Sequence, residues 1–226
     1  GPSFGYPSAS VGYAPGGNAQ GAPYWSDAPG APAGNYSGSQ APQNIDYGPG
    51  DPLNTQGFSK DWSRKLNHVP PQERQGFMNR VQQIAQNLGT DPDWLMAVME
   101  SESQISPRAV NGSTGASGLI QFMPETARSL GTSTYALQNM SATRQLDYVE
   151  RYLAPYKGRM TSPTDAYMAV FSPAFLGRGE NHVAYRAGQK GYGPNRGLDL
   201  NKDGAITNGE LGQKVKQKLA NTPDAR

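Results

Sequence analysis

Two glutamates at the end of an apolar stretch are the side chains best placed for acid–base chemistry. Residues 94–103 read WLMAVMESES, so one residue separates the carboxyl groups of Glu100 and Glu102. On a helix of about 3.6 residues per turn, Glu102 lies in the middle of the apolar arc, whereas Glu100 lies beside Asp93 on the polar face. We therefore expect Glu102 to be buried at the carboxyl end of a helix and Glu100 to be an ordinary surface carboxylate.

The expected position of Glu102 favours the protonated form of its carboxyl group. Burial raises the pKa of a carboxyl group, and the dipole at a helix carboxyl end also disfavours an anion. A carboxyl group that keeps its proton near neutral pH can act as a general acid. The alternative is a buried structural glutamate that an arginine or backbone donors satisfy.

A glycine-containing stretch follows Glu102 and reads SQISPRAVNGSTGASGLIQFMPETA. Gly112, Gly115 and Gly118 predict an irregular loop whose backbone can approach a ligand closely. Pro124 is suited to the first turn of the next helix. The sequence therefore places, directly after the candidate acid, an irregular loop that could approach a ligand.

The helices that must position these residues follow from apolar periodicity and capping signals. They are expected at residues 71–89, 90–103, 124–131, 141–156, 162–171 and about 208–220. Ser162 and Asp165 are expected to form a capping box at the start of one of them. No segment alternates as a strand, so the predicted fold is mainly α.

The spacing of these residues resembles the signature of soluble lytic transglycosylases and goose-type lysozymes. The matching residues are Glu102-Ser103, Pro107-Arg108-Ala109, Gly115-Ala116-Ser117-Gly118-Leu119-Ile120-Gln121 and Pro124-Glu125-Thr126-Ala127. The resemblance covers about residues 70–190. It implies a lysozyme-like helical domain that cleaves the β-1,4 bond between N-acetylmuramic acid (MurNAc) and N-acetylglucosamine (GlcNAc) in peptidoglycan, without a cofactor for catalysis.

The resemblance also implies roles for individual residues. Glu102 matches the catalytic acid of the family. The positions implied to bind substrate are Ser103, Ser113, Gly115, Ala116, Gly118, Gln121, Phe171 and Tyr167. Asn111 is an alternative to Ser113, and Gln121 could instead brace the loop.

One family position departs from the pattern. Where the family often has Ala-Tyr-Asn-Ala-Gly, this chain has Val-Phe-Ser-Pro-Ala at residues 170–174, so a tyrosine hydroxyl is missing. Phe171 could pack on a sugar face or in the core. Tyr167 and Tyr185 are the candidates to replace the lost hydroxyl.

A single catalytic carboxyl group suffices if the substrate supplies the nucleophile. Glu102 would protonate the glycosidic oxygen and then remove the proton from the C6 hydroxyl of MurNAc, giving a 1,6-anhydro sugar. Hydrolysis by a water molecule that Asp147 or Asp165 activates is the close alternative. A degenerate glycan-binding or structural protein of the same fold is a third reading.

Residues 199–210, DLNKDGAITNGE, match an EF-hand calcium loop. The predicted ligands of a structural Ca²⁺ ion are Asp199, Asn201, Asp203, Ala205, Thr207 and Glu210. The preceding residues are too rich in glycine to predict an entering helix, whereas an exiting helix is expected. The alternative is a turn that binds no ion.

Composition divides the chain into three parts: an arm at 1–57, a lysozyme-like domain at 58–190, and a calcium loop with a last helix at 191–226. The first 50 residues hold 11 of the 28 glycines and 8 of the 19 prolines, which is typical of an extended or linker segment. The net charge of +2 does not favour a nucleic-acid partner. No apolar run is long enough to span a membrane.

The absence of cysteine and the presence of only two histidines disfavour disulfides, thiolate metal sites and a Ser-His-Asp triad. No signal peptide is evident at the start of the sequence. The arm and the lysozyme-like signature together suggest a phage tail, virion or secretion-apparatus protein that acts in the cell envelope. Residues 1–57 would then bind protein partners, and peptidoglycan strands would be the substrate.

Overall fold

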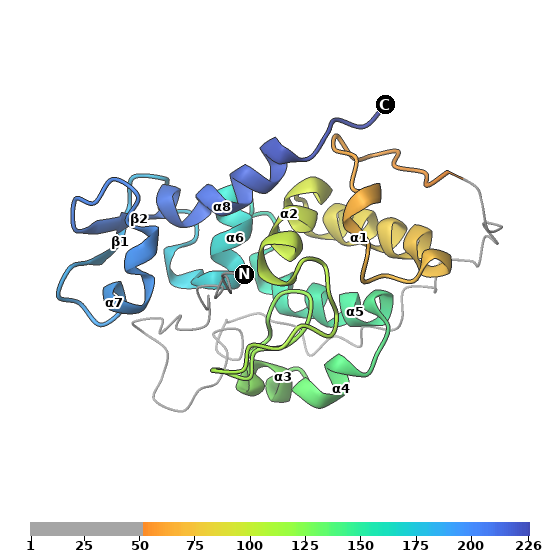
Figure 1. Cartoon of the computed structure of the whole chain (residues 1–226), viewed down its shortest axis with the longest axis horizontal. Helices are drawn as coiled ribbons and strands as arrows, with labels where there is room; N and C mark the ends of the chain where they lie inside the picture. The colour runs from red at the N-terminus through yellow and green to blue at the C-terminus, as the bar shows by residue number, and fades with distance from the viewer. Residues whose placement is uncertain (1–51) are drawn as a thin grey trace, which may run out of the picture.

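The structure, a computed structural model, describes residues 52–226 (Figure 1). Most of the predicted arm lies outside these residues. The described part is mainly helical, as predicted. Its α-helices are α1 (Arg74–Leu88), α2 (Pro92–Ser103), α3 (Pro124–Ser129), α4 (Thr134–Gln138), α5 (Ala142–Leu153), α6 (Pro163–Phe171), α7 (Tyr192–Asn195) and α8 (Asn208–Asn221). Short 3-10 turns cover Ser63–Lys65, Pro71–Glu73, Ala154–Tyr156, Pro173–Phe175 and Arg196–Leu198.

The helix ends follow the local chemistry of the sequence. Gly89 ends α1 with a left-handed backbone, φ +66°. The side chain of Asp91 caps α2 by accepting a hydrogen bond from the Asp93 amide at 2.8 Å. Gln104 ends α2, also in the left-handed region, at φ +55°. Helix α2 therefore terminates directly after Glu102 and Ser103, where the loop begins.

The expected capping box of α6 forms only in part. Ser162 accepts a hydrogen bond from the amide of Asp165 at 3.0 Å, as predicted. The carboxylate of Asp165 bonds the hydroxyl of Thr161 at 2.9 Å rather than the amide of Ser162. The hydroxyl of Thr161 and its amide, which donates to Asp165 at 3.3 Å, thus take the place of the Ser162 amide.

The expectation that no strand forms is wrong for two short segments. Strands β1 (Val183–Arg186) and β2 (Ala205–Thr207) pair antiparallel, with Tyr185 opposite Ile206 and Arg186 opposite Ala205. Each is too short to display alternation in the sequence. Helix α7 and the 3-10 turn after it also precede the 199–210 loop, where an entering helix was not expected.

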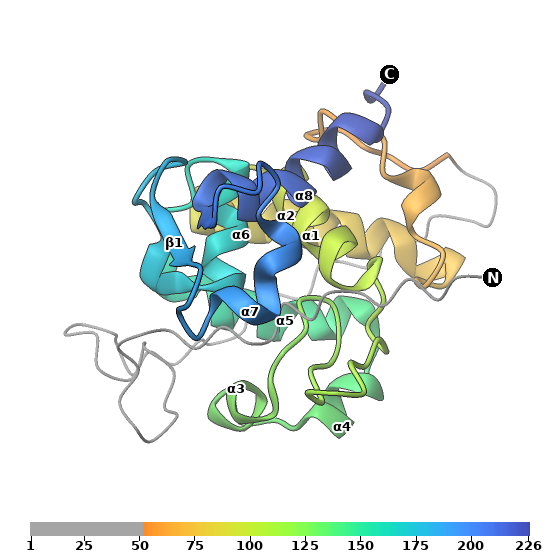
Figure 2. The same ribbon diagram turned by 60° about the vertical axis from the view of Figure 1, so that its left-hand side comes forward.

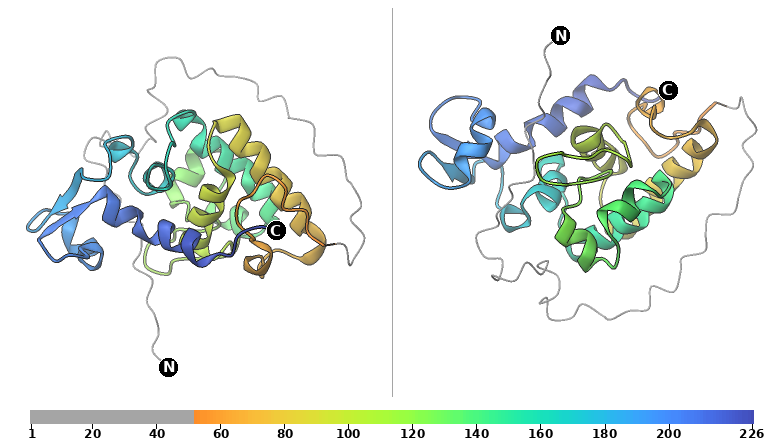
Figure 3. Two further views of the ribbon diagram at one scale, coloured as in Figure 1. Left: turned by 90° about the horizontal axis from the view of Figure 1, so that it is seen from above. Right: turned by 60° about the horizontal axis from the view of Figure 1, so that its bottom comes forward.

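Helix α8 spans the molecule and connects its two ends. It packs against α2 and α6, while α1 packs against α2 and α5. Figure 3 shows that α8 starts beside β1 and β2 and runs back toward the region of α1. There the amide of Asp61 donates to Pro223 O at 2.7 Å, and the amide of Ala225 donates to Ser59 O at 2.9 Å. We call β1, α7, β2 and α8, residues 183–221, the C-terminal module.

The core lies between α1, α2, α5, α6 and α8, and its largest fully buried side chains include Trp62, Phe77, Met96 and Tyr167. Within residues 52–226, no helix is long and apolar enough to cross a bilayer. Residues 52–57, assigned to the arm by composition, contact α1. The Asn54 amide donates to Gln75 Oε1 at 2.7 Å, and Gln75 Nε2 donates to Asn54 O at 3.0 Å.

Candidate active site

Glu102 is buried at the carboxyl end of α2, as the helical pattern predicted. Its side chain is only 2% exposed, and its Oε1 lies 3.5 Å from the Nζ of Lys214 on α8. Burial raises the pKa of the Glu102 carboxyl group above its ordinary value, although the ammonium group of Lys214 opposes this shift. The site therefore holds a carboxyl group that keeps its proton to higher pH than a surface glutamate does.

The prediction that Glu100 is a surface carboxylate is wrong. Its side chain is 8% exposed and lies 3.7 Å from Lys65 and 3.9 Å from Lys218. Helix α8 and the turn at 63–65 cover this face of α2. The periodicity of α2 alone could not reveal elements that come from distant parts of the chain.

Two tyrosines from other helices face Glu102. Burial and the nearby charge of Glu102 raise the pKa of Tyr152 on α5 and of Tyr167 on α6. The Tyr152 hydroxyl donates to Ala169 O at 3.0 Å, whereas the buried Tyr167 hydroxyl has no hydrogen-bond partner among the described residues. Tyr167 is thus a fully buried polar group beside Glu102 whose hydroxyl has no hydrogen-bond partner in this part of the chain.

Two further aromatic candidates have different environments. Phe171 occupies the position where the family often has tyrosine, and Tyr185 is a candidate to replace the missing hydroxyl. Phe171 is buried and stacks on Tyr167 with ring centroids 5.3 Å apart, so it belongs to the core in this structure. Tyr185 from β1 acts electrostatically on Tyr167 and packs edge-on against Phe175. Of the two tyrosines proposed to replace the missing hydroxyl, Tyr167 therefore lies beside the candidate acid, and Tyr185 lies beside Tyr167.

The glycine loop, residues 104–123, is held by its own backbone. The Ser117 and Phe122 amides and carbonyls bond each other at 2.8 and 3.0 Å, and the Gly118 amide donates to Ala109 O at 2.8 Å. Gly115 and Gly118 have φ values of +74° and +85°, which only glycine adopts readily. Two of the three glycines predicted to shape this loop, Gly115 and Gly118, do so through their backbone conformation, whereas Gly112 is not left-handed.

Gln145 of α5 anchors the loop, and the sequence reasoning missed it. Its side chain is fully buried; Oε1 accepts from the Leu119 amide at 2.6 Å, and Nε2 donates to Pro107 O and Leu137 O at 3.0 and 2.8 Å. A Cβ at Gly118 would lie 2.4 Å from Gln145 Oε1. The available signal was a polar side chain at the flank of the apolar face of residues 141–156.

The polar side chains of the motif mainly brace the loop. The Ser103 hydroxyl donates to Leu119 O at 2.8 Å, and Gln121 Nε2 donates to Ala109 O and Gly118 O at 3.2 and 3.1 Å. Ala116 is buried, whereas Ser113 is exposed and its amide bonds Asn111 Oδ1 at 2.9 Å. Direct contact of Ser103, Ser113, Gly115, Ala116, Gly118 or Gln121 with substrate stays a prediction.

The two carboxylates considered for water activation have other partners. Asp147 pairs with Arg80 of α1 at 3.0 Å. Asp165 lies in the first turn of α6 and accepts hydrogen bonds from Thr161 and from the Gly177 amide. Within residues 52–226, neither forms an ion pair or hydrogen bond with Glu102 or Lys214.

In the 199–210 loop, backbone amides donate hydrogen bonds to the Asp199 carboxylate. Asp199 accepts from the Asp203 amide at 3.1 Å and from the Gly204 amide at 2.9 Å, and Gly204 is left-handed at φ +82°. Glu210 bonds the Leu200 amide at 2.6 Å and completes a capping box with Thr207. In the described part of the chain, no three carboxylate, imidazole or thiolate groups cluster closely enough to hold a metal ion.

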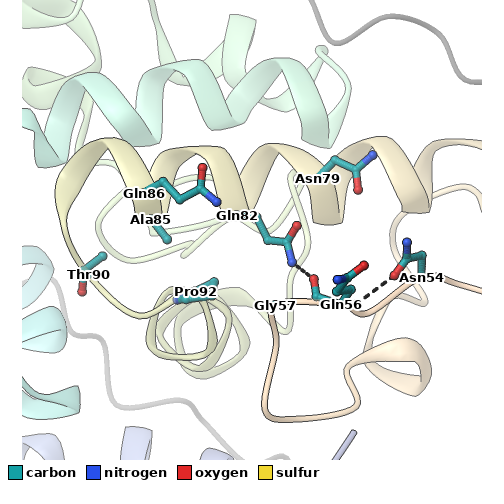
Figure 4. Close-up of a pocket in the computed structure, with 9 residues that line it drawn as sticks. All are labelled: Asn54, Gln56, Gly57, Asn79, Gln82, Ala85, Gln86, Thr90 and Pro92. Atoms are coloured by element: carbon teal, nitrogen blue, oxygen red, sulfur yellow. Dashed lines mark hydrogen bonds between the residues drawn. The ribbon is translucent and has the colours of Figure 1, made fainter. Parts of the chain in front are cut away.

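A separate pocket of about 450 Å³ lies at the opposite end of α2, between α1 and residues 54–57 (Figure 4). Amide side chains dominate its lining: Asn54, Gln56, Asn79, Gln82 and Gln86. Gln82 Nε2 bonds the carbonyl of Gln56 across it. The pocket contains neither a charged side chain nor an aromatic one.

Comparison with known proteins gives a consistent picture. Residues 79–169, which include α2 and the glycine loop, match the family model described as Transglycosylase SLT domain. The chain is also similar to Membrane-bound lytic murein transglycosylase C of Yersinia enterocolitica (serotype O:8 / biotype 1B), with 27% identity over 135 residues, 58% of this chain and 35% of that protein. The chain thus spans about a third of the length of this relative. Residues 79–169, which contain Glu102 and the loop that follows it, are thus similar to the transglycosylase SLT domain family.

Proposed function

We propose that the protein is a peptidoglycan lytic transglycosylase that cleaves the β-1,4 bond between MurNAc and GlcNAc. The observation that carries the proposal is Glu102: a carboxyl group at the end of α2 whose side chain is buried and whose pKa is raised. The match to the family model and the relative's name support the same activity. General acid catalysis requires a protonated group of this kind.

In the proposed reaction, the Glu102 carboxyl group donates its proton to the glycosidic oxygen as the bond from that oxygen to C1 of MurNAc breaks. The Glu102 carboxylate then removes the proton from the C6 hydroxyl of the same MurNAc. The C6 oxygen bonds to C1 and closes a 1,6-anhydro ring. No water is consumed, and Glu102 ends with its proton restored.

Substrate access requires a local movement. A glycosidic oxygen cannot contact a carboxyl group whose side chain is 2% exposed. Lys214 covers Glu102 with a flexible side chain that is itself 24% exposed. We infer that this side chain moves only far enough to expose the Glu102 carboxyl group when a glycan strand binds, so that its ammonium group stays beside the carboxyl group and the α-helical framework stays in place.

Two alternatives remain distinguishable. A hydrolase of the same fold would add water across the bond, although Asp147 and Asp165 are engaged elsewhere. A glycan-binding protein without activity would bind peptidoglycan but release nothing soluble. The test is the turbidity of a suspension of purified sacculi: clearing by the wild type and not by Glu102→Gln supports an enzyme, whereas binding without clearing would contradict the proposal.

We further propose that the 199–210 loop binds Ca²⁺. Its donor set consists of oxygens only, which suits a hard cation. Asp199, Asn201, Asp203, Ala205, Thr207 and Glu210 would hold the ion, and Glu210 would exchange its bond to the Leu200 amide for the metal. The ion would stabilise the turn that joins α7 to β2 and α8.

The calcium proposal has a direct test in the full chain. Calcium should raise the melting temperature, by an amount that grows with its concentration, and EDTA should reverse the rise. Asp203→Asn should weaken the response, while Asp224→Asn, which removes an exposed carboxylate paired with Lys60, should keep it. Identical melting curves with calcium and with EDTA would refute binding.

The finer biological setting is also a proposal. The relative is named as membrane-bound and as a murein transglycosylase, which supports action in the cell envelope. The Gly- and Pro-rich residues 1–57 suit an arm that binds partners in a virion, phage tail or secretion apparatus. Deleting 1–51 should abolish assembly while sacculus cleavage persists; loss of both together would argue against a separate arm function.

A further inference from the structure

Lys214 comes from the C-terminal module, outside the segment that matches the family model. Helix α8 carries it across α2 and α6 (Figure 2). Its Nζ lies 3.5 Å from Glu102 Oε1 and 4.5 Å from the centroid of the Tyr167 ring. Contact with both a carboxyl group and an aromatic face fixes the ammonium group beside the candidate acid.

The other lysines of α8 meet different carboxylates. Lys216 pairs with Glu180 at 2.5 Å, near the surface, and Lys218 lies 3.9 Å from Glu100. These pairs join α8 to the rest of the domain at positions away from Glu102. They therefore provide matched controls on the same helix.

Resting on the proposed function, we propose that Lys214 is a positioning residue that orients Glu102 and stabilises its carboxylate after the proton has moved to the glycosidic oxygen. A buried carboxylate without a counter-charge is costly. In the lyase reaction, Glu102 must exist as a carboxylate between proton donation and proton recovery. Lys214 supplies the positive charge at that stage and, by covering the group at rest, keeps water from it.

Within residues 52–226, Lys214 is the charged group that offsets the charge of the Glu102 carboxylate. Tyr152 of α5 and Tyr167 of α6 are the titratable groups on the other packed helices, and burial raises the pKa of both, so they stay neutral. On α1, Arg80 is paired with Asp147 and Glu150 of α5. On α8, Lys218 faces Glu100 instead.

The sign of the expected effect follows from the roles. A general acid must be protonated, so cleavage is lost as pH rises through the pKa of Glu102. Removing the ammonium group withdraws support for the carboxylate, and the pKa of Glu102 rises further. In Lys214→Met the alkaline limb of the cleavage rate therefore moves to higher pH, and Lys214→Arg restores it toward the wild-type position.

The experiment uses the full chain in wild-type, Lys214→Met, Lys214→Gln, Lys214→Arg and Lys218→Met forms. Carboxyl-¹³C NMR titration follows Glu102, whose resonance is assigned by its loss in Glu102→Gln. The pH dependence of release from sacculi is measured on the same proteins. We expect the Glu102 midpoint and the alkaline limb to rise together in the Met and Gln variants, and neither to move in Lys218→Met.

Each outcome decides one claim. A folded Lys214→Met or Lys214→Gln variant with an unmoved Glu102 midpoint would overturn the role of Lys214 while leaving the proposed function intact. A wild type that never releases fragments would overturn the proposed function and, with it, a catalytic role for the pair. A lower melting temperature with an unmoved alkaline limb would show that Lys214 only stabilises the fold.

Discussion

Glu100 and Glu102 lie two residues apart on α2, and both are buried beneath α8, yet their surroundings differ. Glu100 lies between Lys65 and Lys218, whose side chains are each more than one-third exposed. Glu102 has one lysine at 3.5 Å, the partly buried Tyr152 and the fully buried Tyr167 on neighbouring helices, and the glycine loop directly after it. Burial alone therefore does not distinguish the candidate acid from Glu100. What distinguishes Glu102 is that its buried carboxyl group also lies beside tyrosines and next to the glycine loop.

The largest expected difference between the two sites is in activity. Glu102→Gln cannot donate a proton, so release of soluble fragments from sacculi should fall by about 10²- to 10⁴-fold. Glu100→Gln should stay close to the wild-type rate. Equal losses in the two variants would remove the distinction between the sites.

The next expected effect concerns the glycine loop, which follows Glu102 in the chain. Gln145→Leu leaves the Leu119 amide and two carbonyls without their partner, which should lower the free energy of unfolding by about 1–3 kcal/mol and slow cleavage. The matched control is Gln75→Leu, a buried glutamine of α1 that bonds Asn54 at the far end of α2. Chemical denaturation and turbidity measure both; a slower Gln75 variant of equal stability would contradict a local role for Gln145.

The pH dependence of stability should also reveal the burial of Glu102. Because its folded-state pKa is raised, protonated Glu102 contributes stability that is present below its ordinary value of 4.5 and is lost as pH rises through the folded-state value. The melting temperature of Glu102→Gln relative to wild type should therefore increase from acid to neutral pH. Calorimetry across this range tests it, and a difference that shrinks toward neutral pH would contradict the burial argument.

Glu100→Gln should change the stability for a different reason. It loses attraction to two partly exposed lysines, so the free energy of unfolding at neutral pH should fall by about 1 kcal/mol or less. The deficit should diminish in high salt because the lysines are reached by solvent. A variant more stable than wild type at neutral pH would show that desolvation dominates at Glu100 too.

The smallest expected effect on stability is at Tyr167. Its buried hydroxyl has no partner among the described residues, so Tyr167→Phe should melt at or slightly above the wild-type temperature. If that hydroxyl contacts the glycan, cleavage should nevertheless slow. Unchanged cleavage in Tyr167→Phe would assign the contact to another group, and Tyr185→Phe is the corresponding test.

The sequence predicts local features of the site well. The burial of Glu102 follows from the periodicity of α2, and Gly115 and Gly118 indicate the irregular loop, because both depend on neighbouring residues. Glu100 was misplaced because its cover comes from α8. Lys214 and Gln145 were not identified because their partners lie far away in the chain, at Glu102 and in the loop, and no local pattern records such pairs.

The C-terminal module shows the same limit. Helix α8 was predicted from its periodicity, whereas β1 and β2 were not, since each strand depends on pairing with a segment about 20 residues away in the chain. By contrast, the predicted ion ligands in residues 199–210 follow from the fixed spacing of these residues along the sequence. Only the three-dimensional arrangement reveals that the module brings Lys214 to Glu102 and Tyr185 to Tyr167.

The most direct test of the central claim is the mass of the muropeptides released from purified sacculi by the wild type and by Glu102→Gln. A buried acid that recovers its proton from the sugar itself predicts 1,6-anhydro products from the wild type and none from the variant. Products heavier by one water would contradict the lyase reaction. Anhydro products from the Glu102→Gln variant at the wild-type rate would contradict Glu102 as the acid.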